Sequence, residues 1–475
     1  MHRNANFIKD TLPHAHIEGT LPQSINFSID SRTVTPGDLF VALRGQKVDG
    51  HEFIKDALEK GAYGFIVSHE KLDLARAQCA HIKGPWCIIS VADPFNALIE
   101  LARAWRAQFN IPVIGITGSI GKTSTKQTLA HIMDCAHKRY IVSAGNQNTL
   151  LGAALTLLKI RSEHELAIIE MGISKRGEMA QLARLVQPTT AIITGVGHSH
   201  MEGLGSICDI AQEKRDIFKY FKEDSIGIVN GDNPLLASVG YMHPVIKFGT
   251  KTINQVQARK IQISSDRTTF ILKLYRQKFT VNLLDCHEGR IFHTLASIAA
   301  AHLIGIPIAT VLSSLEKLPV VAGRYERRAI TSGGYIINDS YNASPESMKA
   351  ALLALEKIDT FNIKGAVLGD MKELGVNSAF WHRQLGRFLR KVPSLAFVIL
   401  VGDMVKWTRK TMPVNIQVFM AKNWQEAVAL LQPLLTRDCV VLVKGSRSVA
   451  LDQLVNTFAP AIPDKIITKP IEPMP

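Results

Sequence analysis

The sequence predicts an α/β protein with three domains: a small N-terminal α/β domain, a central domain on a mainly parallel sheet, and a Rossmann-like C-terminal α/β domain. Its 475 residues leave room for two to four domains with proper cores. Short apolar runs alternate with helical stretches along the chain, as in parallel sheets, and one run leads through a glycine-rich loop into a helix. We place the domains at residues 1–108, 109–318 and 319–475.

The composition is that of a soluble globular protein, with 46% hydrophobic and 20% charged residues. The longest apolar runs, such as residues 395–401, have the length of a strand, so we expect no membrane span. The N-terminus lacks the apolar region of a signal peptide, and the six cysteines show neither metal-site spacing nor a disulfide framework. We therefore expect a cytoplasmic protein. Separately, we expect the chain to be a monomer.

The net charge of +14 raises the question of a nucleic-acid partner. Basic residues are scattered, however, with only short clusters such as residues 324–328 and 387–391, and aromatic residues do not interleave them. Anionic small-molecule substrates explain the charge at least as well. We expect no nucleic-acid partner, and a nucleic-acid motor or switch remains the alternative from a different functional class.

The N-terminal region alternates short strands and helices. We expect strands at residues 39–43 and 65–67, with a helix at 53–60 between them. Polar signals at residues 31–32 and 49–51 are as consistent with solvated turns as with a binding site. From composition alone, this region is only a small α/β unit.

The central region begins with an apolar strand at residues 111–116, followed by a glycine loop and a helix that continues through Met133. Glycines let backbone N–H groups approach a phosphate, and the helix N-terminus favours an anion. The pattern departs from the general phosphate-binding loop, because Ile116 stands where a first glycine is usual. We predict a nucleoside triphosphate site, with Lys122 on the β/γ-phosphates, a Thr123 or Ser124 hydroxyl on Mg²⁺, and these loop residues: Gly118, Ser119, Ile120, Gly121, Lys122, Thr123 and Ser124.

Three further strands of this region, at residues 166–169, 191–194 and 226–229, each end in polar residues, which should meet at one edge of a parallel sheet. Glu170 follows residues 166–169 and suits a Mg²⁺ carboxylate. His198 and His200 follow residues 191–194; without a third ligand zinc is unlikely, whereas Mg²⁺ contact by one of them is plausible. Lys214 reads by itself as a solvated helix residue.

The C-terminal region again alternates strands and helices, with strands at residues 335–337, 366–368 and 439–443 that end in polar residues. Ser344 and Pro345 supply an N-cap and a first-turn proline to a helix. The region reads as a separate parallel α/β domain.

An ordered set of motifs spanning nearly the whole chain resembles the Mur ligases of peptidoglycan synthesis. It comprises residues 117–123, 145–148, 170–172, 338–345, 367–375 and 444–448. The Tyr-Asn-Ala-x-Pro, Gly-Asp-Met-x-Glu-Leu-Gly and Lys-Gly-Ser-Arg elements resemble most those members that add D-alanyl-D-alanine. A sister Mur ligase or a folylpolyglutamate synthase is the alternative within the class.

The resemblance implies a three-domain fold and a role for each matching residue. Residues 1–108 would bind the UDP-sugar end through Ser31, Arg32, Arg44 and Gly45, residues 109–318 would bind ATP, and residues 319–475 would complete the ligase site. Mg²⁺ would be held by Thr123, Glu170, His200 and Lys214, the last in carbamylated form, with Lys122, Glu170, His200 and Lys214 serving catalysis. The nucleotide would also contact Asn148, Arg324, Asp339 and Asn342.

The implied reaction is the ATP-dependent joining of D-Ala-D-Ala to UDP-N-acetylmuramoyl-tripeptide through an acyl phosphate. Two departures from the family pattern stand out. Thr149 replaces a second Asn, and Leu295 falls where an adenine-contacting Asn is expected, so recognition of the base is left open while the phosphate chemistry is not.

Overall fold

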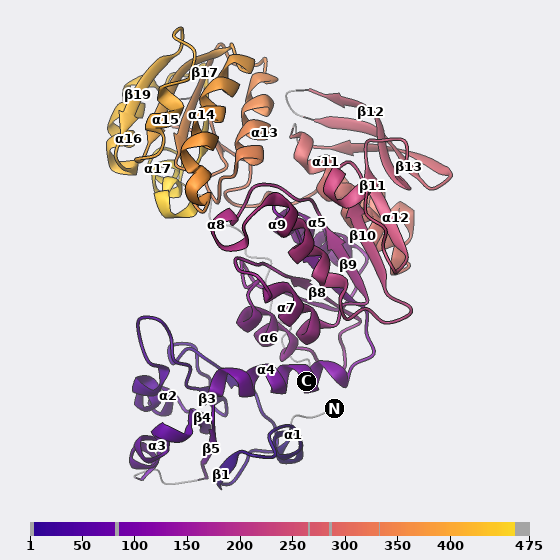
Figure 1. Cartoon of the computed structure of the whole chain (residues 1–475), viewed down its shortest axis with the longest axis vertical. Coiled ribbons are helices and arrows are strands. Elements are labelled where there is room, and N and C mark those ends of the chain that lie inside the picture. The colour runs from indigo at the N-terminus through magenta and orange to yellow at the C-terminus, as the bar shows by residue number, and fades with distance from the viewer. Residues whose placement is uncertain (1–3, 81–84, 265–266, 285–286, 332, 461–475) are drawn as a thin grey trace.

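The computed structural model describes residues 4–80, 85–264, 267–284, 287–331 and 333–460. Each of three successive units of the chain is built on its own β-sheet, with helices packed against it (Figure 1). The N-terminal unit lies at one end of the molecule and the C-terminal unit at the other, with the central unit between them. The α/β class and the three mainly parallel sheets confirm the predicted architecture.

The N-terminal sheet has the order β1-β5-β4-β3-β2, and all of its pairings except β1–β5 are parallel. The predicted strands are β3 and β4, and the predicted helix is α2, preceded by a 3₁₀ turn at Gly50–Phe53. The elements of this unit are α1 (Ala5–Thr11), β1 (His16–Gly19), β2 (Phe27–Ser28), β3 (Leu39–Val41), α2 (Ile54–Glu59), β4 (Gly64–Ser68), α3 (Leu72–Cys79), β5 (Cys87–Val91) and α4 (Pro94–Ala107).

The central sheet has nine strands in the order β14-β13-β12-β11-β10-β9-β6-β8-β7. Strands β7 to β12 pair in parallel, whereas β12, β13 and β14 form an antiparallel extension that the sequence reading did not anticipate. Its strands are β6 (Val113–Thr117), β7 (Tyr140–Val142), β8 (Leu166–Glu170), β9 (Thr190–Ile193), β10 (Ile226–Asn230), β11 (Val245–Gly249), β12 (Val256–Ile263), β13 (Thr268–Leu274) and β14 (Gln277–Leu283).

Eight α-helices and a 3₁₀ turn accompany this sheet in the described part of the chain. Helix α5 starts directly after the glycine loop, as predicted, and α11 packs beside it. They are α5 (Lys122–Cys135), α6 (Leu150–Leu157), α7 (Glu178–Val186), α8 (Met201–Leu204), α9 (Ile207–Arg215), η3 (Asp216–Phe218), α10 (Pro234–Ala237), α11 (Glu288–Leu303) and α12 (Ile308–Leu315).

The C-terminal sheet has the order β15-β16-β20-β17-β18-β19 and is parallel except for β15–β16. Ser344 caps α13 in a capping box with Ser347, and Pro345 occupies the first turn as predicted. The elements are β15 (Glu326–Ala329), β16 (Tyr335–Asn338), α13 (Pro345–Glu356), β17 (Ile363–Gly369), η4 (Gly375–Asn377), α14 (Ser378–Phe388), β18 (Leu395–Val401), α15 (Lys406–Arg409), β19 (Gln417–Ala421), α16 (Trp424–Leu431), β20 (Cys439–Lys444), η7 (Arg447–Val449) and α17 (Leu451–Phe458).

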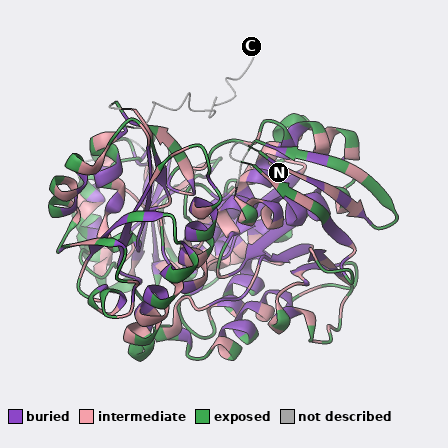
Figure 2. Cartoon of the chain, turned by 90° about the horizontal axis from the view of Figure 1, so that it is seen from above, coloured by how far each residue is buried: buried purple, intermediate pink, exposed green. Residues whose placement is uncertain are grey.

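Burial follows the sheets, because strands covered on both faces by helices lose nearly all contact with solvent (Figure 2). One apolar core runs from the N-terminal unit through α4 into the central unit and includes Ile89, Trp105 and Leu157. The C-terminal unit has separate cores of its own. Within the described residues, none of the helices combines the length and the apolarity needed to cross a bilayer, and the five described cysteines are free thiols.

Candidate active site

The glycine loop leaves the central sheet where the order of its strands reverses. Strand β6 lies between β8 and β9, so the connections from its carboxyl end turn to opposite sides. Such a switch point leaves a crevice beyond the strand ends, where α/β proteins bind ligands. Gly118 to Ser124 occupy that crevice, and Lys122 begins α5.

The two loop glycines are needed for conformation and for space. Gly118 has φ of 149° and Gly121 has φ of 90°, values that strain any residue with a side chain. A Cβ atom at Gly118 would lie 1.9 Å from Thr194 Oγ1, and one at Gly121 would lie 2.4 Å from His293 Nε2. Lys122 Nζ donates to the Gly118 carbonyl at 2.7 Å, so the loop folds back over its own lysine.

Glu170, at the end of β8, lies directly against this loop. Its Oε1 accepts hydrogen bonds from Thr123 Oγ1 at 3.2 Å and from Asn148 Nδ2 at 3.0 Å. Its Oε2 lies 3.1 Å from the fully buried Lys126 Nζ but accepts no hydrogen bond of good geometry. Burial raises the pKa of Glu170, but Lys126 and Lys122 outweigh it, so the pKa lies below its usual value and the carboxylate is charged.

Lys214 is buried in α9, not exposed as its helix context alone suggests. Burial lowers its pKa well below the usual lysine value, and the charge on Lys122 lowers it further. Burial lowers the pKa of Lys122 as well, although Glu170 opposes that change. Both shifts favour the neutral amine, and the shift is the larger one at Lys214.

Two histidines after β9 contact carboxylates of the C-terminal unit. His198 Nδ1 pairs with Glu346 Oε1 of α13, and the ring also lies 4.2 Å from the Trp381 ring. His200 Nδ1 lies 2.6 Å from Glu373 Oε2, and this pairing lowers the pKa of the Glu373 carboxyl. Both pairs connect the central unit to the C-terminal unit.

A cavity of about 490 Å³, here called the interdomain cavity, lies between these two units. Lys122, Thr123, Glu170 and His200 line it from the central unit. The predicted Ser119, Gly121, Asn148, Arg324 and Asn342 also line it, and the C-terminal unit adds Lys372, Glu373, Ser446, Arg447 and Ser448. The structure thus brings most of the predicted nucleotide and metal residues around one space.

An adjoining cavity of about 150 Å³ continues from the same loop. Ser119, Ile120, Gly121 and Ser124 form one wall, and Arg324, Asp339 and Asn342 form another. The rest includes His287, Arg290 and His293, at the start of α11 and just before it. Leu295 does not line it; it is fully buried in the central core, because residues two apart on a helix face different sides.

The C-terminal residues of this cavity are held by a buried ion pair. Lys444 Nζ lies 2.7 Å from Asp339 Oδ2 and also donates to the Asn342 carbonyl at 3.0 Å. Burial lowers the pKa of Lys444, while Asp339 opposes the change. The guanidinium of Arg324 stacks 4.0 Å from the centre of the Tyr341 ring. Strands β16 and β20, which are neighbours, supply Asp339 and Lys444 from the same edge.

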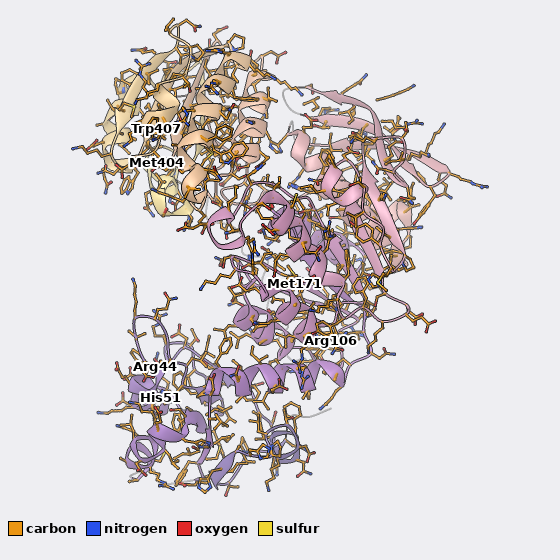
Figure 3. The ribbon with its side chains drawn as sticks, viewed as in Figure 1. Arg44, His51, Arg106, Met171, Met404 and Trp407 are labelled. Carbon is orange, nitrogen blue, oxygen red and sulfur yellow. The ribbon has the colours of Figure 1, made fainter. Side chains whose placement is uncertain are left out.

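The four residues assigned to the UDP-sugar lie in the N-terminal unit and line neither cavity. Ser31 is buried, whereas Arg32 is exposed and pairs with Asp30, whose pKa it lowers to about 2. Arg44 and Gly45 are exposed in the loop after β3. Figure 3 shows Arg44 and His51 in the N-terminal unit, on the far side of the central unit from Met404 and Trp407.

Several residues around the two cavities were missed by the sequence reading. Lys126 lies one helical turn after Lys122, and this spacing could have placed it beside Glu170. Glu373 and Lys444 stand inside recognised motifs but carried no assigned role. The local sequence does not indicate that the start of α11 lies against the glycine loop. It therefore did not predict a role for His287, Arg290 and His293.

Comparison with protein families gives three consecutive matches. Residues 26–106 match the Mur ligase family catalytic domain, residues 116–301 the Mur ligase middle domain, and residues 323–447 the Mur ligase glutamate ligase domain. Two proteins named UDP-N-acetylmuramoyl-tripeptide--D-alanyl-D-alanine ligase are each 32% identical. That of Bacillus subtilis aligns over 95% of this chain and 96% of its own length, and that of Escherichia coli over 90% and 92%.

Solved structures agree with the sequence relatives. MurF from Acinetobacter baumannii superposes with a TM-score of 0.84 at 27% identity, covering 95% of this chain and 98% of the other. MurF from Thermotoga maritima, in complex with ADP, superposes with a TM-score of 0.78 at 28% identity, covering 91% and 96%. The family matches and the aligned relatives together show that this chain belongs to the Mur ligase family.

Proposed function

We propose that this chain is an ATP-dependent ligase that joins D-alanyl-D-alanine to UDP-N-acetylmuramoyl-tripeptide in the cytoplasmic synthesis of peptidoglycan precursors. The interdomain cavity carries the proposal, because the glycine loop, Glu170 and His200 face cations of the C-terminal unit across it. Relatives with this activity in their names, aligned over 90% or more of the chain, support the choice of substrates.

The phosphates of ATP would lie on the loop from Gly118 to Ser124. The N-terminus of α5 and the amides of the loop favour an anion there. Lys122 now donates to the Gly118 carbonyl and would exchange that acceptor for β- and γ-phosphate oxygens. Asn148, held against Glu170, borders the same space.

The base would enter the adjoining cavity, between the loop and the start of α11. His293 lies within that wall, and burial lowers its pKa to about 3, so the ring is neutral near pH 7. A neutral imidazole can both donate and accept a hydrogen bond, as an amide side chain does. In related ligases an Asn is expected to contact the base, and Leu295 stands at its position here. His293 therefore suits that task.

The residues around Glu170 fit a Mg²⁺ ion. Oxygen ligands suit this ion, and Glu170 Oε2 is buried without a well-formed hydrogen bond beside the Thr123 hydroxyl. No three His, Cys, Asp or Glu side chains of the described residues gather to hold a metal alone. Thr123, Glu170, His200 and a modified Lys214 would therefore share it with the nucleotide. When bound, Mg²⁺ supplies neutralisation of phosphate charge.

The modification proposed for Lys214 is a carbamate. Only a neutral amine reacts with CO₂, and the burial of Lys214 favours the neutral form. The product carries a negative charge and two oxygens where an ammonium would repel a metal. A Lys214→Ala variant should therefore lose nearly all turnover and regain part of it with added short carboxylates. Absence of any rescue would contradict the carbamate.

In the proposed reaction the terminal carboxylate of the tripeptide attacks the γ-phosphorus of ATP, which gives an acyl phosphate and ADP. The amine of D-Ala-D-Ala then attacks the acyl carbon, a proton leaves the nitrogen and phosphate departs. Lys122 would stabilise the charge on the transferring phosphoryl group. Arg324 and Asp339 would close over the nucleotide from the C-terminal unit and exclude water from the acyl phosphate.

The N-terminal unit would bind the UDP-sugar end of the donor. Ser31, Arg32, Arg44 and Gly45 lie there, apart from the two cavities. Cations and exposed backbone groups suit a diphosphate. The donor would then extend from this unit to the interdomain cavity, where its terminal tripeptide carboxylate would lie.

The test is phosphate release with ATP, Mg²⁺, UDP-N-acetylmuramoyl-tripeptide and D-Ala-D-Ala, omitting each in turn. Release that requires both muramyl and dipeptide substrates is expected. Release that needs a single amino acid in place of the dipeptide would indicate a sister ligase. Release stimulated by nucleic acid and indifferent to muramyl substrates would overturn the proposal in favour of a nucleic-acid-dependent NTPase.

A further inference from the structure

The antiparallel extension of the central sheet carries a large share of the chain's positive charge. Residues 245–284 contain eight lysines and arginines and one acidic residue, Asp266, which leaves a net charge of +7 out of +14 for the whole chain. The sequence reading took the basic residues as scattered, because these eight are separated along the chain. Folding brings them closer together, since β11, β12, β13 and β14 are successive neighbours in one sheet.

The two faces of this extension have different surroundings. Phe270 and Leu272 of β13 belong to the apolar core of the central unit, and α11 packs against β12. Alternate residues of a strand point to opposite faces. The other face carries Arg259, Lys278 and Thr280, which are exposed, and β12 and β13 lie at the margin of the molecule (Figure 1). This face is therefore accessible to a large partner.

Two lysines stand directly opposite each other on this sheet. The register pairs Lys273 of β13 with Lys278 of β14, and like charges in such positions destabilise a sheet. Within the described residues, neither of these lysines nor Arg259 forms an ion pair. Other cations of the surface do, as Arg76 does with Glu18. The folded chain thus retains a repulsion that a bound anion would relieve.

A β-bulge directs two consecutive cations toward the same space. Successive residues of a regular strand point to opposite faces, but the register between β12 and β13 shifts after Arg259. Lys260, inside the bulge, has φ of 49°, a value that strains a residue with a side chain. Both cations therefore border one hollow of about 390 Å³, here called the basic hollow. It is lined by Arg259, Lys260, Ile271, Lys278, Phe279 and Thr280.

Apolar side chains accompany these cations. Ile271 and Phe279, which line the basic hollow, are half-buried. The Tyr275 N–H donates to the Gln255 carbonyl at 2.9 Å, so the turn after β13 lies beside the loop before β12. At this end of the strands, Ile253 is 62% exposed and Tyr275 is 40% exposed. A nucleic-acid backbone offers no apolar phase to such groups, whereas an anionic bilayer offers a negative surface and an apolar interior together.

We propose that the basic hollow and the cations around it dock this chain on the surface of an anionic phospholipid membrane, with a headgroup phosphate in the hollow. The docking is peripheral, because it depends on the attraction between the cations and the headgroups. The residues of the hollow line neither the interdomain cavity nor the adjoining cavity. The inference is therefore independent of the proposed ligase reaction.

The test is cosedimentation of the full chain with lipid vesicles. Binding is expected with mixed vesicles of phosphatidylglycerol and phosphatidylcholine, should be absent with phosphatidylcholine alone, and should weaken as salt is added. Arg259→Glu/Lys278→Glu should bind the mixed vesicles at least about 20-fold more weakly, because each surface cation contributes about fivefold. Lys159→Glu/Lys222→Glu is the matched control: it alters two exposed lysines of the same unit outside the hollow, changes the net charge equally, and should weaken binding about threefold or less.

Two features of the variants separate docking from folding. Lys278→Glu places opposite charges across from each other at Lys273, so the unfolding midpoint should not fall. Lys260→Gly is a second variant, because glycine adopts a positive φ without strain. It should keep the midpoint of the wild type and bind the mixed vesicles about fivefold more weakly.

The docking surface would be overturned by wild-type chain that ignores the mixed vesicles at low salt or binds neutral vesicles equally well. An unchanged affinity in Arg259→Glu/Lys278→Glu, or an equal loss in the control variant, would also overturn it. Binding of a DNA duplex that depends on Arg259 and Lys278, without binding to vesicles, would assign this face to nucleic acid instead.

Discussion

The central unit joins its two neighbours in different ways. At the N-terminal junction, Trp105 of α4 packs its ring 5.6 Å from the Phe7 ring and 5.0 Å from the Phe109 ring, and donates to the Ile160 carbonyl. One apolar core continues across this junction. At the C-terminal junction, most of the named contacts are polar, as in His198–Glu346 and His200–Glu373, and a cavity separates the facing walls.

The difference assigns separate tasks to the two junctions. Burying apolar side chains stabilises the folded state and opposes relative motion of the units. Exposed ion pairs contribute little free energy and can break and re-form. A ligase of the proposed kind must admit ATP and then exclude water, so the junction that bears the cavity is the one that needs to open.

The largest expected effect is a loss of stability when the apolar junction is disrupted. Trp105→Ala should lower the free energy of unfolding by about 3–5 kcal/mol, because it leaves a cavity in a continuous core. Urea unfolding followed by circular dichroism measures it. Trp407→Ala is the matched control: its ring is half-exposed and lies beside the cations of Lys410 and Arg383, so a loss of about 1 kcal/mol or less is expected. Equal losses of unfolding free energy in the two variants would show that the apolar junction at α4 is no more stabilising than a half-exposed surface site.

The second effect concerns the cavity and should leave stability alone. Lys122→Ala should reduce turnover at least about 100-fold, because it removes a cation from the transferring phosphoryl group. The unfolding midpoint should change little, since Lys122 bonds only to a carbonyl of its own loop in the described structure. Lys159→Ala, at an exposed position of the same unit, should keep full activity. Normal turnover in Lys122→Ala would contradict the assignment of residues 118–124 as a phosphate-binding loop.

The third effect is a pH dependence at the wall of the adjoining cavity. Burial lowers the pKa of His293 to about 3 in the folded state, below its ordinary value of 6.5. The unfolded chain therefore binds the proton more tightly, so stability falls as the pH drops from about 6.5 toward 3, by at most about 1.4 kcal/mol per pH unit. His293→Gln should flatten this slope, whereas His14→Gln, at an exposed site, should not. An unchanged slope in His293→Gln would contradict the lowered pKa of this ring.

The sequence predicted most of the fold, because strand-length apolar runs and helix caps are local signals. The strand at residues 166–169 ends at Glu170, and Ser344 caps α13, as expected. The antiparallel strands β12 to β14 were not anticipated, since their alternating residues do not reveal which partner they will join.

The candidate site was predicted where residues are close in sequence or belong to a recognised motif. Lys122, Thr123 and Glu170 line one cavity in the structure. Glu373, however, reaches His200 only because η4 meets α8 across two units. Likewise, His293 lies over the glycine loop through the packing of α11 on α5. Contacts of this kind depend on tertiary geometry and leave no mark in the local sequence.

The smallest expected effect is at the polar junction itself. Glu346→Gln removes the charge that pairs with His198, at a site where both side chains are partly exposed. The free energy of unfolding should therefore fall by less than about 1 kcal/mol. Small-angle X-ray scattering without nucleotide should nevertheless give a larger radius of gyration than for the wild type, because one contact between the C-terminal and central units is weaker. A loss near 3 kcal/mol would mean that this junction is as stabilising as the one at Trp105, and the contrast between a fixed and an opening junction would fail.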